Sequence, residues 1–323
     1  MANMMKHLVY SPRYNTNLAD FGMEKPFALD RGELVLAELS RRFGTRAAEY
    51  HEPQPISIED ILLVHSERYL QNLTRTATWL DIFEFKEDDY FPERATRQMP
   101  ELLDDLRLKC GGTLLAARIA LDNALCANLG AGYHHAFPDR GRGYCVLHDL
   151  AITIRRLQAE KRVKRVMVVD LDFHQGDGTA LIFKDDPDVF TFSVHSQEGW
   201  PDEKQVSDLD VPILQGEEHL YLEKTQLGLA KAMRRFSPDL VLYVAGSDPY
   251  EKDVLPGTAF MKLTLEQLHK RDDFIIDTFA DLGVPLASVF AGGYGPDVWE
   301  VHYWATQRLL ERSGTLVASQ STR

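Results

Sequence analysis

Carboxylates and an imidazole gather where a predicted strand ends near residue 170. A β-branched run, Val163 to Val169, is followed by Asp170-Leu-Asp-Phe-His-Gln-Gly-Asp-Gly. Residues two apart in an extended chain face the same way, so Asp170, Asp172 and His174 line one side as the strand passes into a loop. Two carboxylates and an imidazole suit a divalent metal such as zinc. A loop whose Asp side chains cap its own backbone is the alternative.

A second apolar run, Leu240 to Ala245, ends in Gly-Ser-Asp248-Pro. In an open parallel sheet the carboxyl ends of the strands meet at one edge, where ligands bind. If the two strands are near neighbours, Asp248 completes a set with Asp172 and His174 that leaves a coordination position open, as catalytic zinc sites do. An Asp-Pro turn without a metal is the alternative.

A third run, Pro285 to Ala291, ends in Gly292, Gly293 and Tyr294. The glycines allow the backbone to approach a ligand closely, and the tyrosine places a phenol at the same rim. A tyrosine of the hydrophobic core is the simpler interpretation. Three strands that each deliver a polar side chain to one edge favour a functional site.

A neighbouring pair of imidazoles, His134 and His135, lies in a glycine-containing segment that we expect to precede a helix. The pair alone is a weak motif, and its value depends on partners. Asp170 and Asp177 remain once the metal ligands are assigned. Each can orient one imidazole by accepting its Nδ1 proton, as carboxylates behind metal sites do.

Helical and strand-like segments alternate from about residue 109, which predicts βαβ units around one parallel sheet. Before residue 109 the chain predicts short helices and loops, with an edge strand at 8–10 and helix caps at Ser57 and Ser66. The predicted helices are 110–128, 149–160, 217–236, 264–282 and one from 296, and the later strands are 163–169, 189–194, 240–245 and 285–291.

Composition excludes several classes of protein. The 323 residues are 44% hydrophobic and 26% charged, as in a folded globular protein. The longest apolar run, Leu240 to Gly246, is far shorter than the roughly 18 residues of a membrane helix. No signal-peptide pattern opens the chain, so we expect a cytoplasmic protein. A net charge of −13 argues against direct nucleic-acid binding. Three cysteines without a CxxC pair predict buried thiols.

The motifs together resemble the zinc-dependent histone deacetylase family. From about Leu8 to Leu310 they occur in the family's order, and the segments that begin at Val9 and Val64, with Gly111-Gly-Thr and Gln175, resemble its class IV branch. The motifs are Gly132-Tyr-His-His-Ala, Gly143-Tyr-Cys, Asp170-Leu-Asp-Phe-His-Gln-Gly-Asp-Gly, Ala245-Gly-Ser-Asp with Asp253, Leu263-Thr, Arg271-Asp and Gly292-Gly-Tyr.

This resemblance implies an arginase/deacetylase-like α/β fold. The expected catalytic domain covers 1–312 and has a central parallel sheet of about eight strands flanked by helices, with the active site at the C-terminal ends of the strands. The remaining residues, 313–323, are expected to form a flexible tail.

The resemblance also implies a reaction, the hydrolysis of acetyl or longer fatty acyl groups from the ε-amine of lysine in a protein or peptide. Zinc would bind Asp172, His174 and Asp248. His135, paired with Asp177, would act as the general base, and His134, paired with Asp170, as an electrostatic partner. Tyr294 would donate to the developing oxyanion.

A monovalent cation, usually potassium, is implied behind the zinc. Its ligands would be Asp170, Ser193 and the backbones of Asp172, His174 and Val194. The substrate tunnel of the family corresponds here to Gly143, Tyr144, Trp200, Gly292 and Gly293.

Other functions stay open. An acetylpolyamine amidohydrolase, which acts on acylated amines, would use the same site. A two-metal ureohydrolase is disfavoured because Asp248 is not followed by a second Asp two residues later. A module that binds acyl-lysine without cleaving it is disfavoured by the complete set of metal ligands and by Tyr294.

Overall fold

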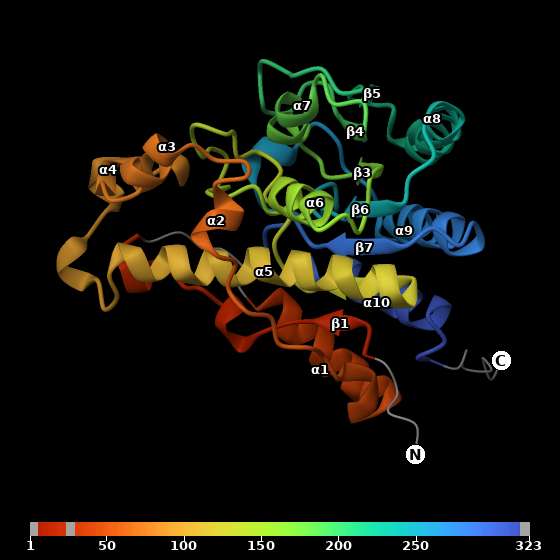
Figure 1. The fold of residues 1–323 in the computed structure, drawn as a ribbon, viewed down its shortest axis with the longest axis horizontal. Coiled ribbons are helices and arrows are strands. Elements are labelled where there is room, and N and C mark those ends of the chain that lie inside the picture. The colour runs from red at the N-terminus through yellow and green to blue at the C-terminus, as the bar shows by residue number, and fades with distance from the viewer. Residues whose placement is uncertain (1–5, 24–29, 317–323) are drawn as a thin grey trace.

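Seven parallel strands form the centre of the computed structural model, which describes residues 6–23 and 30–316 (Figure 1). Their order across the sheet is β1-β2-β7-β6-β3-β4-β5. The single parallel sheet is therefore confirmed, and the described residues contribute seven strands to it where about eight were expected. The strands are β1 (Leu8–Val9), β2 (Leu125–Asn128), β3 (Val166–Asp170), β4 (Val189–Ser196), β5 (Leu209–Ile213), β6 (Leu240–Val244) and β7 (Leu286–Val289).

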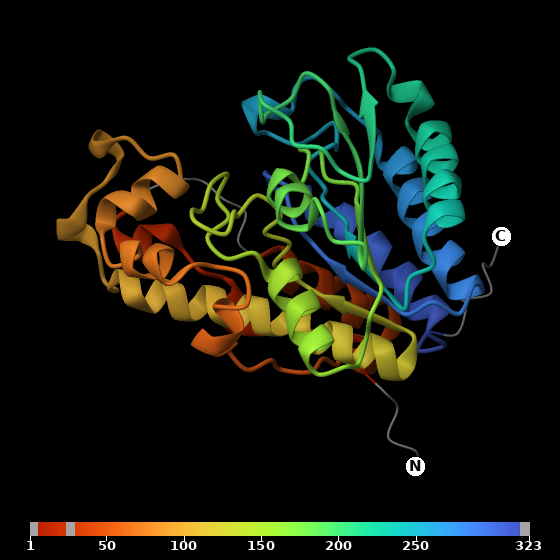
Figure 2. The same ribbon diagram turned by 45° about the horizontal axis from the view of Figure 1, so that its top comes forward.

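Helices cover both faces of this sheet because its central strands are apolar on both sides. Met167 and Val169 of β3 belong to one buried cluster, and the alternating Val166 and Val168 belong to another. Figure 2 shows the long helix α5 (yellow) on one side and α8 and α9 (teal and blue) on the other. One layer contains α5 (Met99–Asn123), α6 (Asp149–Ala159) and α7 (Asp177–Phe183), and the other contains α1 (Arg31–Phe43), α8 (Tyr221–Arg235), α9 (Leu265–Asp281) and α10 (Trp299–Arg312).

Shorter elements fill the N-terminal third and the connections. The predicted caps at Ser57 and Ser66 are confirmed, since the Ser57 Oγ accepts from the N–H of Asp60 at 3.1 Å and the Ser66 Oγ from that of Tyr69 at 3.2 Å. The short elements are η1 (Pro12–Tyr14), η2 (Leu18–Phe21), η3 (Thr45–Ala48), α2 (Ile58–Ile61), α3 (Glu67–Asn72), α4 (Thr76–Ile82), η4 (Glu87–Asp89), η5 (Pro92–Arg94), η6 (Glu218–Leu220) and η7 (Pro256–Thr258).

Two strands differ from the sequence-based expectation. The predicted helix 110–128 is wrong at its C-terminal end, because α5 stops at Asn123 and the chain turns at Ala124, where φ is +72°. The apolar residues that follow form β2, which pairs with β1 and β7. Strand β5 was absent from the prediction; it is a partly exposed edge strand that contains Pro212.

Of the predicted tail, 317–323 lies outside the described residues, and Leu316 is buried in the hydrophobic core. Cys110, Cys126 and Cys145 are buried free thiols, as predicted. Within 6–23 and 30–316, no helix combines the length and hydrophobicity that crossing a bilayer requires.

The buried guanidinium of Arg271 on α9 connects the loops that follow β3 and β6. Its Nη1 donates to the carbonyls of Leu171 at 3.1 Å and Gly246 at 2.7 Å, and its Nε donates to Asp272 at 2.7 Å. Asp272 also accepts from the hydroxyl of Tyr243. One side chain thus holds together the two loops that carry the candidate metal ligands.

We expect Arg271→Met to lower the free energy of unfolding by about 3–5 kcal/mol, because it leaves Asp272 buried without its ion pair. Chemical denaturation measures this loss. Arg41→Met, which removes an exposed ion pair with Glu38, is the control and should change the stability little. Equal losses in both variants would contradict this role for Arg271.

Candidate active site

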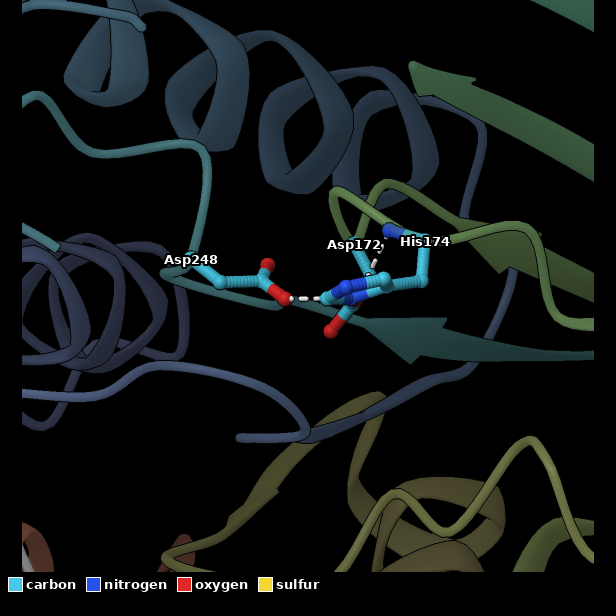
Figure 3. A group of neighbouring side chains, drawn as sticks. All are labelled: Asp172, His174 and Asp248. Carbon is cyan, nitrogen blue, oxygen red and sulfur yellow. Dashed lines mark hydrogen bonds and ion pairs between the residues drawn. The ribbon is translucent and has the colours of Figure 1, made fainter. Parts of the chain in front are cut away.

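Three buried side chains converge at the carboxyl ends of β3 and β6 (Figure 3). Asp172 and His174 lie in the loop after β3, and Asp248 lies in the loop after β6. The Nδ1 atom of His174 is 3.2 Å from Asp172 Oδ1 and 2.9 Å from Asp248 Oδ2. One ligand atom from each residue lies within 4.8 Å of the others. The structure therefore brings together the three residues predicted to bind a metal.

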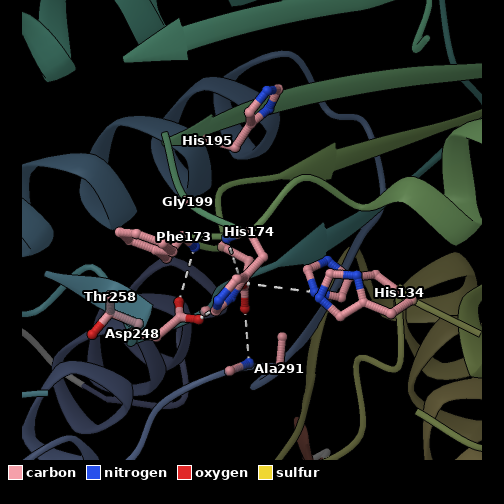
Figure 4. Close-up of polar contacts among 12 residues, drawn as sticks. His134, Phe173, His174, His195, Gly199, Asp248, Thr258 and Ala291 are labelled. Atoms are coloured by element: carbon pink, nitrogen blue, oxygen red, sulfur yellow. Dashed lines mark hydrogen bonds and ion pairs between the residues drawn. The ribbon is translucent and has the colours of Figure 1, made fainter. Parts of the chain in front are cut away.

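Backbone N–H groups orient the two carboxylates. Asp172 Oδ2 accepts from the N–H of Gly292 at 2.8 Å, and Asp248 Oδ1 accepts from that of Phe173 at 2.9 Å. Figure 4 shows the bond between Phe173 and Asp248, with His134 pointing toward the same cluster. A Cβ atom at Gly292 would lie 2.4 Å from Asp248 Oδ2 and 2.6 Å from Asp172 Oδ2. Glycine is required there because the backbone contacts the metal ligands directly.

The charges of this cluster fit a divalent cation. Burial and the charge of Asp172 raise the pKa of Asp248 to about 7. Among the residues that the structure describes, no Lys or Arg forms an ion pair with Asp172 or Asp248. Two carboxylate oxygens and one imidazole nitrogen, all buried and convergent, are a donor set that suits zinc.

The two neighbouring imidazoles are each held by a carboxylate. The Nδ1 of His134 donates to Asp170 Oδ2, and the Nδ1 of His135 donates to Asp177 Oδ1, both at 2.7 Å. Their loop follows β2 and is not directly followed by a helix, contrary to the expectation. In both residues the opposite ring nitrogen, Nε2, is left for other partners.

Electrostatics separates these imidazoles. Burial lowers the pKa of His134, but the carboxylates of Asp170 and Asp172 outweigh burial and raise it to about 9. Burial and the charge of His134 lower the pKa of His135 to about 3, despite Asp177. At neutral pH His134 is therefore charged and His135 is neutral, which makes His135 the proton acceptor of the pair.

Aromatic side chains border the approach to this site. The rings of His135 and Trp200 are 4.7 Å apart between centroids, and those of Tyr144 and Tyr294 are 6.0 Å apart. A Cβ atom at Gly143 would lie 2.7 Å from the Trp200 ring, so a side chain at this position would collide with the tryptophan. Burial and the charges of Asp248 and Asp172 raise the pKa of Tyr294 well above its usual value, which keeps its hydroxyl a donor.

Arg142 supports this border and was absent from the sequence analysis. Its Nη1 lies 3.0 Å from Asp177 Oδ2, and its guanidinium lies 4.5 Å from the centre of the Trp200 ring. It thus links the carboxylate behind His135 to the wall of the passage. Its position, one residue before the Gly143-Tyr-Cys motif, is the only signal that the sequence contains.

The residues predicted to bind potassium lie together at the ends of β3 and β4. Asp170 is paired with Ser193 in the register of these strands, and Val194 is the next residue of β4. The Ser193 Oγ lies 2.9 Å from His195 Nδ1. His195 lies apart from the metal ligands in Figure 4. The potassium site stays a prediction.

A cavity of about 180 Å³ joins the metal ligands to the interior. Asp172, His174, Tyr294 and Gly143 line it, and it continues to Tyr14, Arg31 and Lys109. Neither Arg31 nor Lys109 was singled out from the sequence. The nearest signal is Gly111-Gly-Thr, which follows Lys109 within two residues.

Comparison with known proteins assigns this chain to a family. The family model described as "Histone deacetylase domain" matches residues 25–310. The chain belongs to the histone deacetylase domain family. Histone deacetylase 2 of Arabidopsis thaliana is 31% identical over 293 residues, which cover 89% of this chain and 74% of that protein.

Further comparisons agree with this membership. A protein of Picosynechococcus sp. is 42% identical over 194 residues, which cover 60% of this chain and 64% of that protein, less than two thirds of its length. The crystal structure of the HDA15 HD domain superposes with a TM-score of 0.71 at 19% identity, covering 96% of this chain and 91% of that one. This structural match confirms the fold.

We expect Gly292→Ala to weaken zinc binding by at least about tenfold, because the new methyl group displaces the carboxylates of Asp172 and Asp248. Titration of the metal-free protein with zinc measures this change. The control is Gly257→Ala, since a Cβ atom at that exposed position meets nothing within 4 Å. Unchanged zinc affinity in Gly292→Ala would contradict the assignment of the metal ligands.

Proposed function

We propose that this protein is a zinc-dependent hydrolase that removes an acyl group from the ε-amine of lysine in a protein or peptide. The observation that carries the proposal is the convergence of Asp172, His174 and Asp248 beside a cavity. Asp172, His174, the two imidazoles and Tyr294 line this cavity. When zinc is bound there, it lowers the pKa of a coordinated water to about 7 and polarises a carbonyl.

In this proposal His135 moves the proton. Its Nδ1 is held by Asp177, so Nε2 takes a proton from the attacking water and returns it to the leaving amine. Burial and the charge of His134 lower the pKa of His135, so the imidazole is neutral before the reaction and its Nε2 is available to accept a proton. His134 stays protonated beside Asp170 and stabilises negative charge near the metal.

Tyr294 donates a hydrogen bond to the carbonyl oxygen as that oxygen becomes an oxyanion. With two carboxylate ligands the formal charge of zinc is cancelled, so a separate donor at this position adds to the stabilisation. The N–H of Tyr294 donates to Asp253 Oδ2 at 2.7 Å, which fixes the backbone of the residue. The glycines before it bring the phenol to the rim of the cavity.

The lysine stem passes between Trp200, Gly143 and Tyr144 in this proposal. Aromatic walls exclude water from the alkyl chain, and the missing side chain at Gly143 leaves room for it. The potassium ligands Asp170, Asp172, His174, Ser193 and Val194, the class IV assignment and the cytoplasmic location belong to the same proposal.

Acetylpolyamine hydrolysis is the second candidate. The net charge of −13 favours cationic substrates through long-range attraction. Two-metal ureohydrolase chemistry has less support, because the described residues form one cluster of at least three metal-ligating side chains. Pure binding of acyl-lysine leaves the paired imidazoles without a role.

Turnover of matched substrates distinguishes these candidates. Lysine peptides carrying acetyl, octanoyl or myristoyl groups are compared with an acetylated polyamine in the presence of zinc, with a hydroxamate inhibitor as the control. Hydrolysis of a peptide that the hydroxamate blocks is the expected result. Hydrolysis of the polyamine alone would replace the lysine substrate, and binding without turnover would refute the hydrolase.

We expect Tyr294→Phe to lower kcat by about 10²- to 10³-fold while zinc binding is retained, because the substitution removes one donor to the oxyanion. Steady-state kinetics and metal analysis of the same sample measure both properties. Tyr90→Phe, a tyrosine outside the cavity, is the control. A Tyr294→Phe enzyme with the wild-type kcat would remove this residue from the mechanism.

A further inference from the structure

Two cationic side chains line the part of the cavity that extends beyond the metal ligands. Arg31 is the first residue of α1, and Lys109 lies on α5, so the two come from opposite layers of the fold. Among the described residues that line the cavity, Asp172 of the metal cluster is the one carboxylate. The described lining therefore combines one carboxylate, at the metal cluster, with two cationic side chains.

The ammonium group of Lys109 has no partner in the part of the chain that the structure describes. No hydrogen bond from its Nζ is present, and no carboxylate lies within 4.0 Å. Asp105, one helical turn away, is already paired with Arg97 at 2.7 Å and Arg13 at 3.0 Å. Lys109 thus brings to the cavity a positive charge that no described carboxylate contacts directly, although the charge of Asp105 acts on it from one helical turn away.

Burial lowers the pKa of Lys109 to about 8; the charge of Asp105 opposes this shift, and the charge of Arg31 acts in the same direction as burial. The side chain is still largely protonated at neutral pH. A half-buried ammonium without a directly bonded partner is less well solvated than an exposed one, so an anion that reached it would be stabilised by a charge-assisted hydrogen bond.

Arg31 adds a second positive charge but is held in place by the loop before Tyr294. Its Nη1 donates to the carbonyl of Gly292 at 3.1 Å, and its Nη2 donates to that of Ala291 at 3.0 Å. Among the described residues it has no carboxylate within ion-pair distance. Apolar side chains complete the lining of the cavity, among them Leu18, Leu102, Leu106, Leu129 and Phe290.

We propose that this cavity selects acyl groups that end in a carboxylate, such as glutaryl, and that Lys109 is the residue that determines this specificity. The inference rests on the proposed deacylase function and names its acyl substrate. An alkyl chain would contact the leucines while its terminal carboxylate meets the ammonium of Lys109. A neutral chain of the same length would leave that ammonium without a partner.

The test compares glutaryl-lysine and pentanoyl-lysine peptides, whose acyl chains have the same number of carbons. We expect the wild-type protein to have a kcat/KM at least about tenfold higher for the glutaryl peptide, as a charge-assisted hydrogen bond provides. Lys109→Met should abolish this preference while hydrolysis of the pentanoyl peptide persists. Lys109→Arg retains the charge and should keep the preference.

Lys231→Met is the matched control. It removes one exposed positive charge on α8, and Lys231 does not line the cavity. This variant should retain the glutaryl preference. Equal losses for both peptides in Lys109→Met would assign the lysine a structural role and overturn the inference. Absence of a glutaryl preference in the wild type would overturn it as well.

A binding measurement separates this inference from the proposed function. Dissociation constants of both peptides are measured with Tyr294→Phe and with the double variant that also carries Lys109→Met. If the protein binds the glutaryl peptide more tightly through Lys109 but the wild type hydrolyses neither peptide, the inference is supported and the proposed hydrolase function is refuted. A different result would be that free pentanoate inhibits the enzyme through Lys109 although no glutaryl preference is found. That result would mean that Lys109 and Arg31 bind the carboxylate product released by hydrolysis, and it would overturn the inference.

Discussion

Two carboxylates held side by side in the interior are the constraint on which the rest of the site depends. Asp172 and Asp248 are both fully buried, and no Lys or Arg of the described chain pairs with them. Their repulsion must be offset by His174, by backbone N–H groups and by a cation. The fold supplies the first two directly, and the donor set fits a divalent metal for the third.

The sheet makes this arrangement possible because its parallel strands end at one edge. The loop after β2 carries the imidazole pair, and the loop after β3 carries two of the metal ligands. The loop after β6 carries the third ligand, and the loop after β7 carries the phenol of Tyr294. Arg271 connects two of these loops from behind, and Arg31 holds the glycine loop before Tyr294 from the side. Buried cations bound to carbonyls thus position a site whose own side chains are acidic.

Much of this site was predictable from residue spacing. The alternation in Asp170-Leu-Asp-Phe-His predicts that its polar side chains share one face. The structure brings Asp172 and His174 together with Asp248, and Asp170 binds His134 beside them. The central strands were predictable because their β-branched runs are uninterrupted. Strand β2 was not predictable, because its apolar residues directly follow the long helix α5 and continue the apolar pattern of that helix. Only the pairing of β2 with β1 and β7 distinguishes the strand from the helix. Strand β5 carries too few buried residues to stand out.

The sequence by itself determined which donor atoms are present, which strand ends carry them, and that the chain resembles a deacetylase. Local spacing is sufficient for this because the period of a strand links residue number to direction. Only the tertiary structure decided that His134 and His135 differ in pKa and that Lys109 and Arg31 share a cavity with the metal ligands. Desolvation and contacts between α1, α5 and the sheet cause these properties, and neither is a function of position along the chain.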